Sequence, residues 1–118
     1  MAPTAYPTVV GATNFDLIWF VAAYGDVEAL VGDSVTFTYD EFSDVWIHPS
    51  GDCTQDESIF VGQIGPATVT YRFTQEDAGK SLTFTSSVSD NCLRGQIITF
   101  NVGKFGVLFA FQMSMFLL

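Results

Sequence analysis

The stretch that decides the fold runs from Leu82 to Val102 and reads LTFTSSVSDNCLRGQIITFNV. Leu82 and Phe84 alternate with threonines, and a second β-rich run covers Ile97 to Val102. Alternation of apolar and polar residues is typical of a half-buried strand, and small polar residues between two such runs indicate a hairpin. The loop of this predicted hairpin holds Cys92.

The rest of the chain adds similar short strands. In residues 31–39, a Val-Gly-Asp turn precedes Val35, Phe37 and Tyr39, which alternate on one face. Residues 68–73 alternate in the same way, and Gly, Pro or Asp turns separate the runs. This pattern predicts an all-β antiparallel sandwich. A length of 118 residues allows one domain with a buried core and is too short for two.

One segment is ambiguous. Residues 17–23 form a continuous apolar run within Phe15 to Tyr24, which predicts a buried strand or a short helix. Seven residues are too few to span a bilayer, and no basic segment precedes the run as a secretory signal requires. We therefore expect no targeting signal in this sequence.

The composition excludes several classes of protein. Hydrophobic residues make up 48% of the chain and charged residues 14%, which excludes a disordered polypeptide. The net charge is −9, and the first 71 residues carry ten Asp or Glu without one Lys or Arg. Nucleic acid is excluded as a partner because binding to phosphates requires cations. The acidic face either attracts a basic partner or only keeps the protein soluble.

The strand after Val31-Gly32-Asp33, the two cysteines and the Gly95-Gln96 pair together carry a resemblance. Over residues 27–102 the sequence resembles the phytocyanins, the plant-type branch of the cupredoxins, or blue copper proteins. The resemblance implies a Greek-key β-sandwich over residues 1–104 with a disulfide between Cys53 and Cys92. Such a disulfide favours an oxidising compartment. Two free buried thiols in a cytosolic protein are the alternative.

The resemblance also locates the positions of the family's copper ligands. The first imidazole position falls on Ser43, the thiolate position on Ser86 and the second imidazole position on Asn91, whereas Gln96 keeps the axial position as in stellacyanins. A blue copper site needs two imidazoles and a thiolate, and these residues offer only neutral oxygens and amides. The resemblance thus implies a site without copper or another cofactor, as in the early nodulin-like proteins.

The single histidine offers little to a catalytic site. His48 lies five positions beyond Ser43 and precedes a proline, which predicts a strand end or loop and a surface or capping role. A ligand or general-base role is the alternative. No serine lies in a nucleophile-elbow motif, so we expect no enzyme.

The final segment, residues 105–118, is a fourteen-residue apolar tail without a charge. It is too short to span a bilayer as a helix, and it lacks the polar spacer of a lipid-anchor signal. Contact with a partner or membrane, packing on the sandwich and an uncleaved anchor signal stay open. The residues predicted to make partner or membrane contact are Phe105, Val107, Leu108, Phe109, Phe111, Met113, Met115 and Phe116.

Together these observations predict a non-catalytic, copper-free structural or interaction protein. We expect it outside the cytoplasm, at a cell surface, secreted or in an organelle lumen, where its acidic face and tail contact a protein partner or the subunits of a membrane-associated assembly. The alternative is an electron-transfer cupredoxin whose metal is held unconventionally, through His48 or a reduced Cys53 or Cys92.

Overall fold

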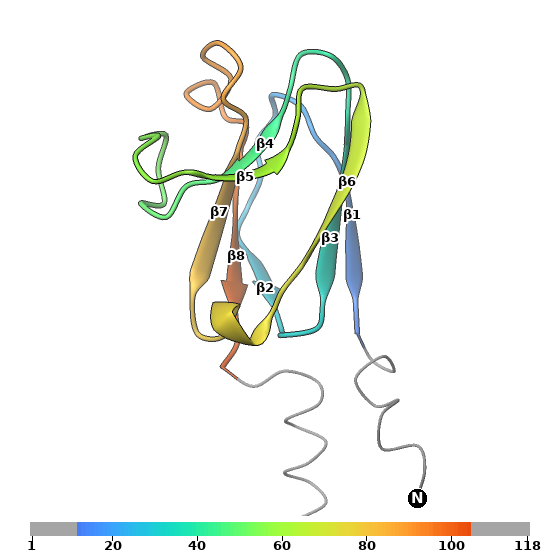
Figure 1. The fold of residues 1–118 in the computed structure, drawn as a ribbon, viewed down its shortest axis with the longest axis vertical. Coiled ribbons are helices and arrows are strands. Elements are labelled where there is room, and N and C mark those ends of the chain that lie inside the picture. Colours follow the sequence, from blue (N-terminus) through green and yellow to red (C-terminus); the bar gives the residue numbers. More distant parts are fainter. Residues whose placement is uncertain (1–11, 105–118) are drawn as a thin grey trace, which may run out of the picture.

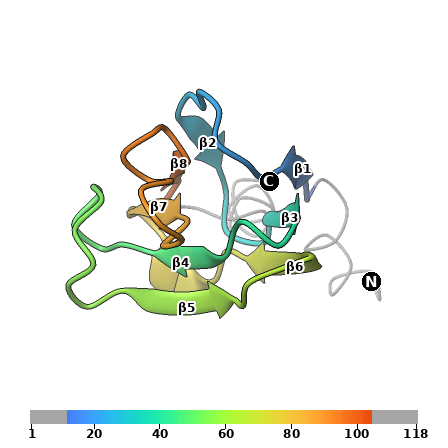
Figure 2. The same cartoon turned by 90° about the horizontal axis from the view of Figure 1, so that it is seen from above.

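Two β-sheets pack face to face in the computed structural model, which describes residues 12–104 (Figures 1 and 2). One sheet has the strand order β1-β3-β6 and the other the order β2-β8-β7-β4-β5. The all-β sandwich predicted from the sequence is confirmed. Its elements are β1 (Asn14–Ile18), β2 (Val27–Ala29), β3 (Ser34–Tyr39), β4 (Val45–Ile47), β5 (Ile59–Gly62), β6 (Ala67–Arg72), the 3-10 turn η2 (Gln75–Asp77), β7 (Ser81–Thr85) and β8 (Ile97–Val102).

The pairing is mixed rather than purely antiparallel. Strand β1 pairs with β3 in parallel, and β2 pairs with β8 in parallel, whereas the other pairings are antiparallel. The reason is that β1, β2 and β3 alternate between the two sheets. Parallel neighbours need such a crossover, which a hairpin turn cannot supply. The sequence reveals strand patterns but does not show this alternation.

Aromatic rings fill the space between the sheets. The predicted face of β3 is confirmed, because Val35, Phe37 and Tyr39 are all buried. The Phe37 ring lies 5.1 Å from that of Phe84 on β7, and Phe84 lies 5.7 Å from Phe100 on β8. Edge-to-face and tilted pairs at this spacing add to the hydrophobic contribution of burial. These contacts fix the two sheets against each other.

The ambiguous apolar run is neither a buried strand nor a helix, because only Leu17 and Ile18 belong to β1 and residues 19–23 form an irregular segment after it. Strand β1 lies at the edge of its sheet, and its side chains alternate between exposed and half-buried. Trp19 is buried, with 1% exposure, whereas its neighbours Ile18 and Phe20 are 68% and 51% exposed. An edge strand has one covered face only, which leaves Ile18 in solvent, and the irregular segment after β1 buries Trp19 but not Phe20.

The hairpin of β7 and β8 is confirmed, with Leu82 opposite Phe100 and Phe84 opposite Ile98. Gly95 closes its loop with φ of 115°, and a Cβ there would lie 3.1 Å from the Ala22 carbonyl oxygen. A side chain at this position would therefore be strained. The loop consequently packs closely against the segment that follows β1.

The domain predicted over residues 1–104 extends beyond the described residues at its beginning, and the tail contacts predicted in residues 105–118 lie outside them. Within residues 12–104, no helix has the length and apolar character needed to cross a membrane.

Candidate functional site

The loop between β3 and β4 and the loop between β7 and β8 lie at the upper end of the sandwich in Figure 1, and hydrogen bonds bring their residues Ser43, Ser86, Asn91 and Gln96 together. The Gln96 amide lies 2.9 Å from Ser43 Oγ. Asn91 Nδ2 lies 2.7 Å from the Phe42 carbonyl oxygen and 3.4 Å from Ser86 Oγ. The four side-chain positions are at most 8% exposed. Residues far apart in the sequence thus form one buried polar cluster.

Gln96 lies at the centre of this cluster and is fully buried. Its amide oxygen is best turned toward Trp19 Nε1, at 3.2 Å, and the Phe20 amide nitrogen, at 3.3 Å, because both neighbours can only donate. In this orientation the oxygen also accepts from Ser43 Oγ at 2.9 Å. Gln96 therefore ties the loop after β1 to the loop after β3.

Asp44 is a member of the site that the sequence reasoning missed. Its carboxylate is 6% exposed and accepts from Ser87 N at 2.6 Å, Ser87 Oγ at 2.5 Å and Trp46 Nε1 at 3.0 Å. Ser86 Oγ also donates to it, at 3.3 Å. Hydrogen bonds thus satisfy this carboxylate, and it secondarily raises the pKa of Tyr39, after burial as the main cause. The sequence offered one signal that Asp44 belongs to the site, because it directly follows Ser43.

His48 is buried, which corrects the predicted surface role. It follows the end of β4, as predicted, but is only 1% exposed. Nδ1 lies 2.9 Å from the Asp52 carbonyl oxygen and must donate to it, so Nε2 accepts from Thr85 Oγ1 at 3.0 Å. The loop after β4 folds over β7 and covers the ring. Neither ring nitrogen keeps a lone pair free for a metal.

The disulfide between Cys53 and Cys92 is confirmed, with Cα atoms 5.8 Å apart. It joins the loop after β4 to the loop of the β7–β8 hairpin, near the polar cluster. Both sulfurs are used in this bond, so a thiolate ligand would require its reduction. In residues 12–104, no three His, Cys, Asp or Glu side chains gather as a metal site would require.

A shallow hollow of about 280 Å³ opens above the cluster. Ser43, Asn91 and Gln96 line it, and Arg94 reaches it from the hairpin loop. The aromatic side chains of Phe20 and Phe42 also line it, and they are 51% and 64% exposed. The opening above the buried polar cluster thus carries two exposed aromatic side chains together with charged residues.

Comparison with known proteins places the fold and not the activity. No family model matches the sequence, and no curated protein matches it. Cucumber stellacyanin in its Cu²⁺ form has a similar structure, with a TM-score of 0.53, 16% identity and coverage of 78% of this chain and 96% of that one. A reduced amicyanin variant gives a TM-score of 0.45 at 16% identity, covering 79% of this chain and 83% of that one. The similarity to stellacyanin shows that the two-sheet sandwich has the cupredoxin fold.

Proposed function

We propose that this chain is a non-catalytic, copper-free cupredoxin-like protein that acts by binding a partner. The buried cluster of Ser43, Ser86, Asn91 and Gln96 supports this proposal. The resemblance to phytocyanins implies that these four positions correspond to the copper-ligand positions of that family. Here their side chains bond to one another and to nearby backbone groups.

The chemistry of the cluster favours a structural role over a metal site. Copper in such a site is held by soft thiolate and imidazole ligands, whereas hydroxyls and amides are hard and neutral. A metal would also have to displace existing hydrogen bonds, because Asn91 Nδ2 donates to the Phe42 carbonyl oxygen and Ser86 Oγ donates to the Asp44 carboxylate. Each displaced buried bond would leave an unpaired group, with a penalty of about 1–3 kcal/mol.

The electron-transfer alternative lacks such support. It requires His48 or a reduced cysteine as ligand, but the His48 nitrogens are both engaged and the two cysteines form a disulfide. Freeing these ligands would break the two hydrogen bonds of the His48 ring or the disulfide that ties down the loop between β4 and β5. A partner-binding role needs no such rearrangement.

The net charge of −9 supports a basic partner, because a strongly acidic surface attracts opposite charge over long distances. The uncharged segment 105–118 would supply an apolar contact with a protein or a membrane assembly. The disulfide supports a location outside the cytoplasm, at a cell surface, in a secreted form or in an organelle lumen.

Copper retention tests the proposal. The folded, non-reduced full chain is incubated with Cu(II), desalted, and analysed for metal and visible absorbance. We expect no stoichiometric copper and no intense visible band. Retention of one copper per chain would overturn the proposal. A variant with Ser43→His, Ser86→Cys and Asn91→His is the matched control, and its copper uptake would show that the assay detects a restored site.

A further inference from the structure

A second concave region lies far from the polar cluster, on the open side of the sandwich. Strands β5 and β6 are close at the upper end, where a Cβ on Gly62 would lie 2.9 Å from Val69 Cγ2. Below this contact the two strands diverge, and η2 closes the lower end (Figure 1). A groove of about 660 Å³ lies in this region, with Ile59 of β5 and Tyr71 of β6 among its lining residues. This volume is in the range of about 300–1,000 Å³ that is usual for binding sites.

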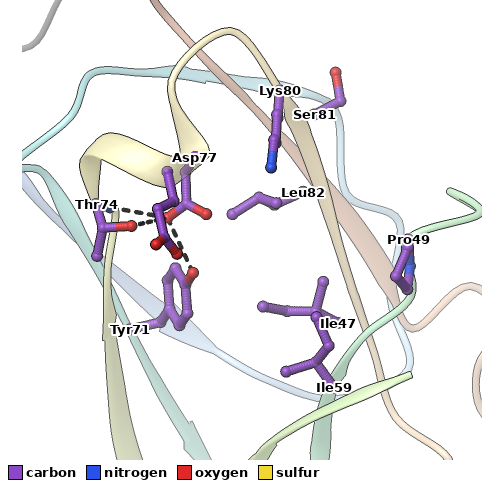
Figure 3. Close-up of a pocket in the computed structure, with 10 residues that line it drawn as sticks. Ile47, Pro49, Ile59, Tyr71, Thr74, Asp77, Lys80, Ser81 and Leu82 are labelled. Carbon is purple, nitrogen blue, oxygen red and sulfur yellow. Dashed lines mark hydrogen bonds between the residues drawn. The ribbon is translucent and has the colours of Figure 1, made fainter. Parts of the chain in front are cut away.

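The groove has an apolar floor and a polar end (Figure 3). Tyr71 of β6 lies across from Ile47 and Ile59, and Leu82 lies between them and the polar end. Ile59 is 53% exposed although its side chain lines the groove. An apolar side chain inserted here would therefore remove apolar surface from water on both walls.

Strand β6 borders the same groove through Tyr71. Strand β6 is the edge of its sheet. Phe73 N donates to the Asp33 carbonyl oxygen, and the Phe73 carbonyl oxygen accepts from Gly32 N, so both groups of Phe73 point toward β3. Because these directions alternate along a strand, the groups of Thr70 and Arg72 point to the free edge. An extended segment can pair with such an edge.

The charges at the polar end select the kind of segment. The Asp77 carboxylate already accepts from Tyr71 Oη at 2.9 Å and from Thr74 N at 2.8 Å. Glu76 is exposed beside it and Lys80 supplies one cation, so the lining charge is one negative. The chain as a whole carries −9. A basic residue beside an apolar anchor therefore complements this end of the groove.

We propose that this groove binds an extended basic segment of a partner protein, which adds as a strand to β6 and inserts an apolar side chain between Tyr71 and Ile59. The proposal deepens the proposed function and rests on it, since it names the site and the class of the partner. Copper retention would overturn the proposed function without affecting peptide binding at the groove. The two failures are therefore distinguishable.

Selection from a random heptapeptide library displayed on phage tests the site, with the folded full chain as target. Ile59→Glu replaces the apolar side chain opposite Tyr71 by a charged one, so the loss of the apolar contact is expected to outweigh the added attraction for Lys or Arg. Phe60→Glu is the matched control, because Phe60 is similarly exposed, at 56%, but its ring packs edge-to-face against Trp46, with ring centroids 5.2 Å apart, and does not line the groove. We expect peptides with alternating apolar residues and Lys or Arg to be enriched on the wild type and on Phe60→Glu. On Ile59→Glu their affinity falls at least tenfold.

The charge preference has its own pair of variants, which also covers a failure of Ile59→Glu to fold. Glu76→Lys reverses the exposed charge in the lining, and Gln75→Lys adds a charge at the exposed neighbour outside it. We expect Glu76→Lys to weaken the selected peptides more than Gln75→Lys does. Equal weakening by both variants would contradict a contact with the polar end.

Backbone pairing is tested by NMR with a selected peptide. We expect the amide signals of Thr70 and Arg72 to shift when the peptide binds. We also expect N-methylation of every second peptide amide to lower the affinity at least tenfold when the methylated amides face β6, and to leave it unchanged when they face away. No enrichment on the wild type, equal enrichment on Ile59→Glu, or insensitivity to N-methylation in both registers would overturn the proposal.

Discussion

Replacing Gln96 by Met tests whether the buried cluster holds the loops together. Met has nearly the same volume, so the change removes hydrogen bonds without creating a cavity. In this variant, Trp19 Nε1 would still donate a hydrogen bond to the Asp44 carbonyl oxygen, at 3.0 Å. Phe20 N would still donate one to Tyr24 Oη, at 3.1 Å. Ser43 is buried, with 2% exposure, and its hydroxyl would lose the Gln96 amide as its hydrogen-bond partner.

The magnitude follows from this count of lost partners. One buried hydroxyl without a partner is destabilising by about 1–3 kcal/mol, and the two groups that keep a partner add less. We therefore expect Gln96→Met to lower the free energy of unfolding by about 2 kcal/mol. Urea denaturation followed by circular dichroism measures this value, provided that the slope stays constant. Gln63→Met, at an exposed turn, is the control and should change stability by less than about 0.5 kcal/mol.

A double-mutant cycle separates the hydrogen bond from packing. Ser43→Ala removes the hydroxyl that Gln96→Met leaves unpaired, so the double variant should be less destabilised than the sum of the two single variants. Additive losses would refute the reasoning, because they would mean that Ser43 and Gln96 do not depend on each other. Equal losses in Gln96→Met and Gln63→Met would refute it as well.

Three further predictions concern the disulfide, an alkaline transition and the buried histidine. Replacing Cys53 and Cys92 by Ser should lower the free energy of unfolding by about 4 kcal/mol, since the bond closes a loop with a sequence separation of 39, and a loss below about 1 kcal/mol in urea would contradict this. Burial, and then the hydrogen bond to a carboxylate, raises the pKa of Tyr71. The contribution of Tyr71 to stability is complete below the unfolded pKa of about 10 and is lost as pH rises through the pKa in the folded protein. Tyr71→Phe should therefore flatten the decline in melting temperature at alkaline pH. An unchanged decline would contradict the assignment. His48→Leu removes the donor to the Asp52 carbonyl and should speed limited proteolysis between β4 and β5, whereas an unchanged cleavage rate would contradict that anchoring role.

Local patterns predicted the strands well because period-two alternation depends on near neighbours. Val35, Phe37 and Tyr39 are buried on one face, and β7 and β8 form the predicted hairpin. The same reasoning failed at residues 17–23, where an apolar run predicts a buried strand or a short helix but only Leu17 and Ile18 belong to a strand, at the edge of its sheet. Whether a strand lies at an edge depends on the partners that other segments provide, and a local pattern does not contain that information.

The site was predictable only in part, for a related reason. The four positions named from the resemblance meet in one cluster, but the role of Asp44 depends on Ser87, 43 residues away. His48 is buried because the loop after β4 folds over β7, a non-local contact that its own neighbours do not predict. Burial of polar residues in loops is set by tertiary packing, and sequence spacing gives no measure of it.

The most direct test of the copper-free account is a site-resolved titration. The full chain, labelled with ¹⁵N and non-reduced, receives one equivalent of Cu(II), and paramagnetic broadening is followed amide by amide. We predict that the signals of Ser43, Ser86, Asn91 and Gln96 stay sharp together, because their side chains are already paired with one another and with the backbone. Selective loss of these four signals at one equivalent would contradict the account and place a metal in the cluster.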